Sequence, residues 1–377
     1  MSRASLRNEG KIHLGMIYAN DPTGATGLLQ LRAALRFRRL LDRWLGDAVD
    51  RIRTSTPFDY LVAPDSLLPP ETLAAFYGRI EAAYHAELAA DPTLDYLGAR
   101  PNRLFDLLPY DEAACSLAPG SFQAVFRTAE RAIDTDDLAH GVRAAVAAAP
   151  GIRFCGGHEV RGITGHDDRL VVEGLANGRE FAIASRHVVN ATWERRLALD
   201  RGFGLPVAAG ALHRLKYRVV VRLPETLRHA PSVTMVLGRY GDVVVRHDTA
   251  YLSWYPAGLQ GWSSDVEPPR SWDAACRGEP PADVAAEVAL ATIAAIGRWM
   301  PAVAGAEPVV IDAGAIVAHG HTDVDDPASG LHGRTRVGTV SRGGYHSVDP
   351  GKLTTAPLFG HEVADRVDRA LRVGADQ

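Results

Sequence analysis

The stretch 342–364, which reads RGGYHSVDPGKLTTAPLFGHEVA, constrains the fold of this chain more than any other. It begins with Gly343 and Gly344, turns at 349–351 and enters a predicted helix near Thr354. Adjacent glycines allow a backbone to approach a flat ligand closely, because no side chain stands in the way. A helix start that faces a cleft also offers free N–H donors to an electron-rich group. Taken alone, the stretch is better interpreted as an ordinary loop followed by a packing helix.

Local signals predict the helix itself. Thr354 or Thr355 is expected to cap it, and Pro357 suits its first turn. Leu358 and Val363 then fall on one side of the helix and predict a buried stripe.

The composition is that of a globular protein. Its 377 residues predict about two domains. A net charge of −4 gives no broad electrostatic case for a nucleic-acid partner. The longest apolar run, 282–300, is interrupted by charged residues, so it predicts an amphipathic helix and no membrane span.

Cysteine and lysine are both scarce in this chain, and the cysteines bear on its cellular compartment. The three cysteines lie far apart and form no CxxC motif, which favours a reducing compartment and argues against a disulfide framework. We therefore expect a cytoplasmic protein. Arginine is abundant, whereas the only lysines are Lys11, Lys216 and Lys352.

The first third of the chain is predicted to be largely helical. Asp21 opens a helix that runs to about residue 45, and Pro69 precedes a second helix with an apolar face. A short strand is expected at 58–62, and 123–127 is expected to be extended. The intervening segment 91–120 is loop-rich.

A different pattern starts at Ala132. Thr135 is expected to cap a helix over 136–149, which Pro150 and Gly151 end. Strands are predicted at 152–155, 170–173, 180–183 and 187–190. A helix, a strand, a meander and another strand suit one half of a layered α/β nucleotide-binding domain.

The composition changes again after Gly204. Strands rich in Val, Thr and Tyr are predicted at 216–223, 232–237, 242–246 and 251–255, and they suggest an antiparallel sheet with one face covered. A long helix over 282–299 follows. Two further short strands are predicted at 308–311 and 314–317.

Motifs that would carry chemistry are weak or absent. His319, His321 and Asp323 alternate as metal ligands on a strand do, but Gly320 disfavours a regular strand, so polar loop residues are the better interpretation. We predict no metal site. The sequence contains no GxSxG, no P-loop and no GxGxxG.

The run YLSWY places two phenols on one face of a strand. Tyr251, Ser253 and Tyr255 alternate with apolar residues. They suit a substrate cleft or the moist face of a sheet, and the pattern does not decide between the two.

Four segments in a fixed order resemble a known family: NEGKIHLGMIYANDPTGAT, VVNATWERR, YLSWYPAG and YHSVDPGKLTTAPL. The chain resembles the FAD-dependent oxidoreductases of the D-amino-acid-oxidase/glycine-oxidase class, and most closely a bacterial branch with KIHLG and GKLT-AP signatures. The likeness covers nearly the whole chain. It implies an α/β (α+β) fold in which a Rossmann-like FAD-binding domain, truncated at its N-terminus, is joined to a mixed or antiparallel-sheet substrate domain that covers the flavin.

The resemblance also implies domain boundaries and cofactor contacts. The FAD-binding domain would comprise 1–20, 125–204 and 310–377, with a helical part of the substrate domain at 21–124 and its antiparallel sheet at 205–309. The residues implied to hold FAD are Ser5, Asn8, Gly10, Lys11, Ile12, His13, Leu14, Glu159, Val160, Asn190, Ala191, Thr192, Gly343, Gly344, Gly351, Lys352, Leu353 and Thr354.

One departure from the family is large. Family members open with a strand–GxGxxG–helix–strand unit whose backbone reaches the pyrophosphate. About 30–40 residues, the size of one such unit, have no counterpart here. The expectation is that the true start lies upstream, that a second polypeptide supplies the unit, or that the protein has lost tight FAD binding.

The resemblance implies hydride transfer from an amine or amino-acid-like substrate, a small molecule, to flavin N5. Tyr251, Tyr255, Arg342 and His346 are the candidate catalytic residues: an arginine suits a substrate carboxylate, the phenols suit a cleft wall, and His346 lies beside the glycine pair. Arg246 is a further candidate contact, although a solvated strand residue is the safer interpretation there. The alternative function is a non-catalytic paralogue that serves as a binding or interaction module.

Overall fold

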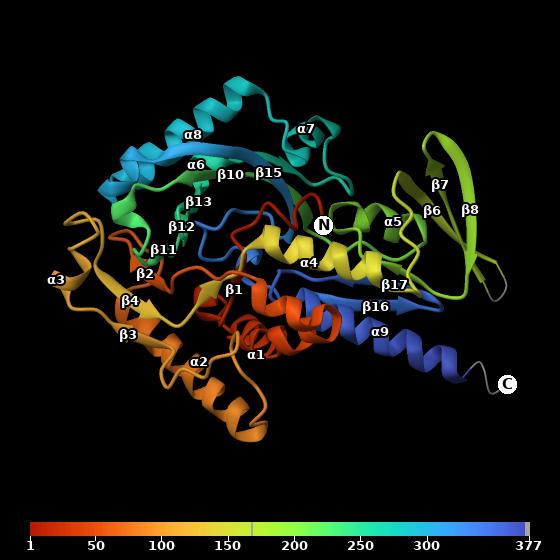
Figure 1. Ribbon diagram of the computed structural model, residues 1–377, viewed down its shortest axis with the longest axis horizontal. Helices are drawn as coiled ribbons and strands as arrows, with labels where there is room; N and C mark the ends of the chain where they lie inside the picture. Colours follow the sequence, from red (N-terminus) through yellow and green to blue (C-terminus); the bar gives the residue numbers. More distant parts are fainter. Residues whose placement is uncertain (167–168, 374–377) are drawn as a thin grey trace.

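The structure is a computed structural model that describes residues 1–166 and 169–373. Its largest feature is a nine-stranded sheet in the order β14-β10-β13-β12-β11-β2-β4-β3, with β15 also paired to β10 (Figure 1). The strands are β2 (Phe58–Val62), β3 (Phe105–Leu107), β4 (Ala124–Thr128), β10 (Ala211–Arg222), β11 (Ser232–Val236), β12 (Gly241–Arg246), β13 (Thr249–Trp254), β14 (Leu259–Ser263) and β15 (Glu307–His319).

The sheet is antiparallel except for the parallel pair β11–β2. Strands β10 and β15 pair along their whole length, from Ala211 opposite His319 to Arg222 opposite Glu307. The prediction of two short strands at 308–311 and 314–317 was therefore wrong. Gly314 disfavours a continuous strand as judged from the sequence. In the structure its backbone pairs with Lys216, so β15 continues through it.

One face of this sheet packs against helix α8 (Ala282–Gly297), which crosses above it in Figure 1. Val288, Ala289 and Ile296 of α8 are buried in the same core as Val219 and Val221 of β10. The short helices α6 (Tyr255–Gly258) and α7 (Asp273–Arg277) flank it. In the part of the chain that the structure describes, no single helix is long and apolar enough to cross a membrane; the segments Arg270–Arg277 and Ala282–Gly297 pass that test only together and are bent by 66°.

Helices α1 (Ala25–Leu45) and α2 (Pro70–Ala90) lie on the other side of the molecule, and α3 (Tyr110–Ala113) is a single turn near β4. Tyr77 of α2 packs edge-on against Phe126 of β4, with ring centroids 5.2 Å apart. Helix α1 starts later than predicted, because the Asp21 carboxylate accepts from the N–H of Thr23 in the preceding turn and from the N–H of Thr26 in the first turn of the helix.

A second group of elements surrounds two small sheets. β1 (Lys11–Ile12) pairs with β5 (Arg131–Ala132), and β17 (Tyr345–Asp349) pairs with β16 (Gly338–Arg342) and, in parallel, with β9 (Val188–Asn190). Helices α4 (Thr135–Ala148), α5 (Arg196–Gly202) and α9 (Ala356–Val373) cover them. The cap of α4 is Asp134, one residue before the predicted Thr135, because its carboxylate accepts from the N–H groups of Asp136 and Asp137.

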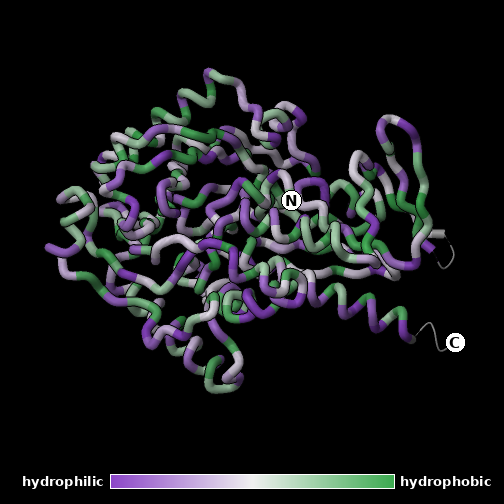
Figure 2. The backbone as a smooth tube through the Cα atoms, in the orientation of Figure 1, coloured by the Kyte–Doolittle hydropathy of each residue, from purple (hydrophilic) through white to green (hydrophobic). Residues whose placement is uncertain are grey.

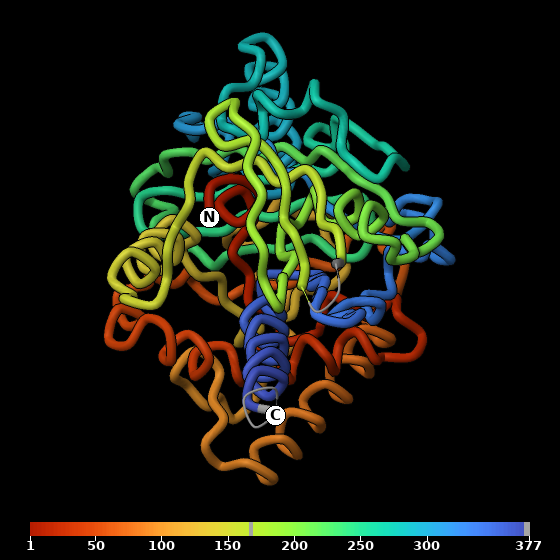
Figure 3. Tube along the Cα trace, turned by 90° about the vertical axis from the view of Figure 1, so that its right-hand side faces the viewer, coloured from red at the N-terminus to blue at the C-terminus, as the bar shows by residue number. Residues whose placement is uncertain are grey.

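The sheet β6 (His158–His166), β7 (Arg169–Ala176) and β8 (Arg179–Ser185) stands at one end of the molecule (Figures 1 and 3). Hydrophobic stretches run along its strands (Figure 2). The strand predicted at 152–155 does not form. Ile152 and Phe154 are 54% and 80% exposed, and no described strand lies beside them to complete a ladder.

The predicted class, a mixed α+β fold with an antiparallel sheet next to a smaller layered unit, is confirmed. The large sheet and the segment before α9 enclose the space described next.

Candidate functional site

Two adjoining cavities lie between β10, β13 and β15 of the large sheet and the loop that leads into α9. The larger has a volume of about 550 Å³ and the smaller about 200 Å³. They meet, because six polar side chains line both of them: Glu9, Lys11, His13, Lys216, Arg334 and Lys352.

The segments 8–14 and 350–354 are held together by a short network. The N–H of His13 donates to Thr354 Oγ1 over 2.9 Å, and that hydroxyl donates in turn to the carbonyl of Lys11. Thr354 therefore bonds to β1 and is not the predicted helix cap. The network brings the two segments that the sequence implied to be cofactor contacts to one wall of the larger cavity.

Lys11 is neutralised within this wall. Its ammonium donates to Thr234 and lies 2.9 Å from Asp242 Oδ1, and it stands 4.2 Å from the ring centroid of Phe58. Burial opposes ionisation of Asp242, but Lys11 and Lys216 outweigh it and hold the pKa of that carboxyl below its usual range. Lys11 and Asp242 thus form a closed ion pair.

His13 is buried between two carboxylates. Its Nδ1 is 3.6 Å from Glu130 Oε1 and its Nε2 is 3.8 Å from Glu9 Oε1, so neither nitrogen makes a hydrogen bond. Burial lowers the pKa of His13, which keeps the imidazole neutral at physiological pH. The ring therefore offers a donor and an acceptor that the described residues leave unused.

Three cations at the junction of the cavities behave differently from Lys11. Lys216, Arg334 and Lys352 are half-buried, and their charged groups make no hydrogen bond or ion pair to any described residue. Burial favours the neutral carboxyl of Glu9, but Lys352 and Lys216 lower its pKa to about 2. Glu9 is thus the one ionised carboxylate at this junction, among the residues described, that is not already bound in a close ion pair.

The charge on Lys352 makes a testable contribution to stability. Burial, together with Arg334 and Lys216 and against Glu9, lowers its pKa from 10.5 to about 8. Between these values the unfolded chain binds the proton and the folded chain does not, so the free energy of unfolding of the ligand-free protein is expected to rise with pH from about 8 to about 10. Urea unfolding at about pH 7.5 and about pH 9.5 measures this rise. Lys352→Met is expected to remove most of it; an equal rise in that variant would contradict the assignment.

The two candidate tyrosines line the site at different places. Tyr251 borders the larger cavity and Tyr255 the smaller. Tyr255 accepts a hydrogen bond from Arg214, and its hydroxyl donates to Asp323 Oδ1 over 3.0 Å. Burial, opposed by Arg214, raises the pKa of Tyr255 to about 12, so the phenol stays neutral.

Several implied cofactor contacts line the larger cavity, and others lie behind its wall. Those that line it are Ser5, Asn8, Lys11, His13, Ala191, Gly351, Lys352 and Leu353. Gly10, Ile12, Leu14 and Thr354 are adjacent and buried. Asn190 points away from the cavity and bonds to Asp200 and Tyr345, and Thr192 bonds to Asn190.

The remaining candidates lie elsewhere. Gly343 and Gly344 form the two-residue turn between β16 and β17, and a side chain on Gly344 would meet the carbonyl of Arg186 at 2.2 Å. Arg342 donates to the carbonyl of Gly204. His346 is buried beside His187, with 3.1 Å between ring nitrogens. None of these residues lines either of the two adjoining cavities.

Two other predicted residues are also remote. Glu159 and Val160 lie on β6, where the Glu159 carboxylate pairs with Arg161. Arg246 donates to the carbonyl of Glu9, so it supports the wall of the site from behind. Arg334, which the sequence reading missed, carries no distinguishing local pattern. Lys216 had a usable signal: all of the chain's lysines line this one site.

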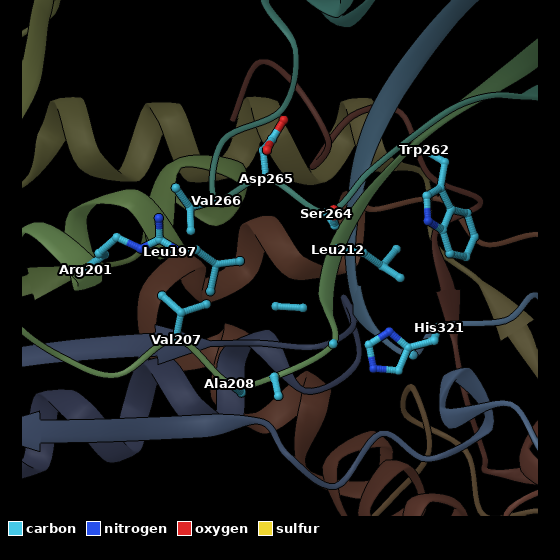
Figure 4. Close-up of a pocket in the computed structure, with 14 residues that line it drawn as sticks. Leu197, Arg201, Val207, Ala208, Leu212, Trp262, Ser264, Asp265, Val266 and His321 are labelled. Carbon is cyan, nitrogen blue, oxygen red and sulfur yellow. The ribbon is translucent and has the colours of Figure 1, made fainter.

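A separate cavity of about 320 Å³ opens near α5, with Arg201 and His321 at opposite ends (Figure 4). A neighbouring space of about 330 Å³ reaches from His321 to Arg334 and Gly351 at the main site. Within the described ranges, no group of three or more His, Cys, Asp or Glu side chains is placed to hold a metal ion.

Sequence comparison gives no relative. No family model matches the chain, and no curated protein matches it significantly. The structure, in contrast, matches several solved proteins along nearly its whole length. Glycine oxidase from Geobacillus kaustophilus superposes with a TM-score of 0.65 at 18% identity, covering 98% of this chain and 85% of that one. The chain has the glycine-oxidase fold.

Two further proteins with this fold are similar to it. Iminodiacetate oxidase from Chelativorans sp. BNC1 has a TM-score of 0.62 at 16% identity and covers 96% of this chain and 84% of its own. L-α-Glycerophosphate oxidase from Mycoplasma pneumoniae, solved with FAD bound, has a TM-score of 0.60 at 14% identity, with 97% and 85% covered. These likenesses confirm the fold class that the sequence resemblance implied, and the truncation at the N-terminus stays a prediction.

Proposed function

We propose that this chain is a FAD-dependent oxidoreductase that oxidises a C–N bond of an amine or amino-acid-like small molecule. The observation that carries the proposal is the pair of adjoining cavities that share one polar wall, in a chain with the glycine-oxidase fold. Two compartments in contact suit a cofactor and a substrate that must react with each other.

The larger cavity fits a flavin ring. Its volume of about 550 Å³ lies within the usual range for a cofactor site. Gly351 brings backbone to its edge, and the unpartnered nitrogens of His13 offer hydrogen bonds inside it. We propose that Ser5, Asn8, His13 and the segment 351–353 hold the ring.

Bound FAD would supply a two-electron acceptor. The chain's own residues would bind and orient the substrate and exclude water from it. Tyr251 and Tyr255 offer neutral phenols on the two cavity walls, and Glu9 offers a carboxylate that can accept a hydrogen bond from the substrate amine. Lys352 would place a positive charge on the wall of the cavity that we assign to the ring.

We assign cofactor binding and substrate binding to the domains whose boundaries were predicted from the sequence. Residues 1–20, 125–204 and 310–377 would bind the cofactor, and 21–124 with 205–309 would bind the substrate. A cytoplasmic setting is supported by the free state of Cys115, Cys155 and Cys276. A net charge of −4 supports a small-molecule partner and no nucleic acid.

A second polypeptide is a further proposed partner. Strand β9 is the edge of its sheet among the described strands, and Val189 on it is 44% exposed. An open strand edge that carries an exposed apolar side chain can pair with a further strand. FAD uptake that requires an added strand-forming polypeptide would support this partner.

The first test is the flavin content of the purified chain. Stoichiometric FAD released on denaturation, with bleaching of the bound flavin by an amine under anaerobic conditions, is the expected result. A folded, colourless protein that ignores added FAD would overturn the enzyme proposal. The chain would then fit the alternative, a non-catalytic paralogue that serves as a binding module.

The second test compares the rate of flavin reduction in variants of the two tyrosines with the rate in a variant of a remote arginine. Tyr255→Phe removes the bonds to Arg214 and Asp323, and Tyr251→Phe removes the hydroxyl at the larger cavity. Each is expected to slow anaerobic flavin reduction by about tenfold or more, since a lost substrate-orienting bond costs about 1.4 kcal/mol or more.

Arg342→Ala is the control, because that side chain contacts only the Gly204 loop in the described structure. Its rate is expected to stay within about twofold of the parent. A loss in Arg342→Ala equal to that of the tyrosine variants, at unchanged flavin content, would move the substrate site to the β16–β17 hairpin.

A further inference from the structure

The smaller cavity has more positive than negative charge on its wall. Lys11 and Asp242 neutralise each other at 2.9 Å, and Arg214 is shared between the Tyr255 hydroxyl and Asp323. After these pairs are set aside, Lys216, Arg334 and Lys352 face Glu9. The junction therefore holds three cations and one carboxylate.

This excess is costly in the empty protein. Arg334 and Lys216 both act on Lys352 by like-charge repulsion, and the partly buried position weakens screening by solvent. The charged groups of all three are free of hydrogen bonds and ion pairs to the described residues, so none is a structural ion pair that folding itself has used. A bound anion would offset this cost.

The number of charges restricts the anion. A ligand with one carboxylate pairs with one cation, or at most bridges two, and leaves at least one cation uncompensated. The excess, with Glu9 already counted, is two positive charges, so a ligand with two acidic groups and an uncharged nitrogen compensates it fully. Glu9 can accept a hydrogen bond from an N–H of that nitrogen.

We propose that the smaller cavity binds a small molecule with two acidic groups, and that the amine substrate of this protein is itself such a dianion. Lys216 and Arg334 would bind the acidic groups, Lys352 would face both cavities, and Glu9 would face the nitrogen. The identity of this ligand as the substrate rests on the proposed function; its binding to the cavity does not.

The test is the affinity of the purified full-length protein for malonate and for acetate, measured by calorimetry at equal ionic strength and neutral pH. Malonate is expected to bind at least about tenfold more tightly than acetate, since one added charge-assisted pair is worth about 1.5–3 kcal/mol. Equal affinities for the two anions would overturn the proposal.

Variants locate the site. Lys216→Met and Arg334→Gln are each expected to weaken malonate binding at least about tenfold, to near the acetate level. Lys216→Arg keeps the charge and is expected to keep the affinity within about threefold. Arg298→Gln removes an exposed charge that borders neither cavity and is expected to change nothing. Malonate binding that survives both Lys216→Met and Arg334→Gln would also overturn the proposal.

The malonate-binding experiment can be interpreted whether or not the chain binds FAD. Flavin content is measured on the same preparations, and circular dichroism confirms that each variant is folded. A colourless protein that binds malonate through Lys216 and Arg334 would refute the oxidoreductase proposal and uphold this one. A flavin-loaded protein that does not prefer malonate would do the reverse.

Discussion

Replacing Gly351 by valine is expected to weaken FAD binding at least about 30-fold. Gly351 has φ of +62°, and a Cβ built on it would stand 2.6 Å from Val337 Cγ1. A left-handed β-branched residue costs about 1–2 kcal/mol, and overpacking adds about 1–3 kcal/mol. The loop is expected to relieve this penalty of at least about 2 kcal/mol by leaving the conformation that borders the larger cavity. FAD binding must then restore that conformation, which gives the stated loss of affinity.

The measurement is the dissociation constant of FAD, from fluorescence or absorbance titration of the protein after removal of its flavin. Gly343→Val is a matched control. Gly343 has φ of +59°, so valine there carries the same backbone strain, but no atom lies within 4 Å of its added Cβ and it borders no cavity described above. FAD binding by Gly343→Val is expected to stay within about threefold of the parent. If Gly343→Val loses FAD and Gly351→Val does not, the flavin lies at the hairpin.

Gly343 and Gly351 show what the sequence alone could not predict. Both belong to one short stretch, both suit close backbone approach, and the pattern could not tell which of them faces a cavity. The difference is set by partners far away in sequence. Gly344 packs against the backbone of Arg186, and Thr354 near Gly351 bonds to β1.

Local elements were more predictable. Strand β2 (Phe58–Val62) matches its prediction at both ends, and α2 begins at Pro70, where the proline pair indicated a helix start. Their signals are residue periodicity and helix-start chemistry, which are local. The failures involve pairing between strands. The segment 152–155 has strand-forming residues but no described partner, whereas β15 runs unbroken through Gly314 because β10 lies beside it.

The site depends both on features that are visible locally in the sequence and on contacts between distant segments. The lysines are identifiable in the sequence by their scarcity, yet nothing local indicates that Lys11, Lys216 and Lys352 meet at one junction. The fold makes that connection through β1, β10 and the loop before α9. The resemblance named two of these segments together, and the structure adds the third.

The second large effect is expected at a buried carboxylate away from the cavities. Replacing Asp200 of α5 by alanine is expected to lower the free energy of unfolding by about 3–5 kcal/mol, the usual effect of breaking a buried charged network. Asp200 is buried and accepts four hydrogen bonds, two on each carboxylate oxygen. The donors are Asn190 (2.9 Å), Tyr345 (2.7 Å), Ser347 (2.7 Å) and Arg196 (3.0 Å).

Urea unfolding at neutral pH measures the loss, and Asp42→Ala, an exposed change on α1, is expected to shift the free energy by no more than about 0.5 kcal/mol. Asp200→Asn keeps the shape but replaces one acceptor oxygen by a donor, so an intermediate loss is expected. The four donors come from β9, α5 and β17, so Asp200 ties together the sheet whose β9 edge is open. If Asp200→Ala unfolds with the parent's midpoint and slope, that unit is held together by its apolar contacts alone.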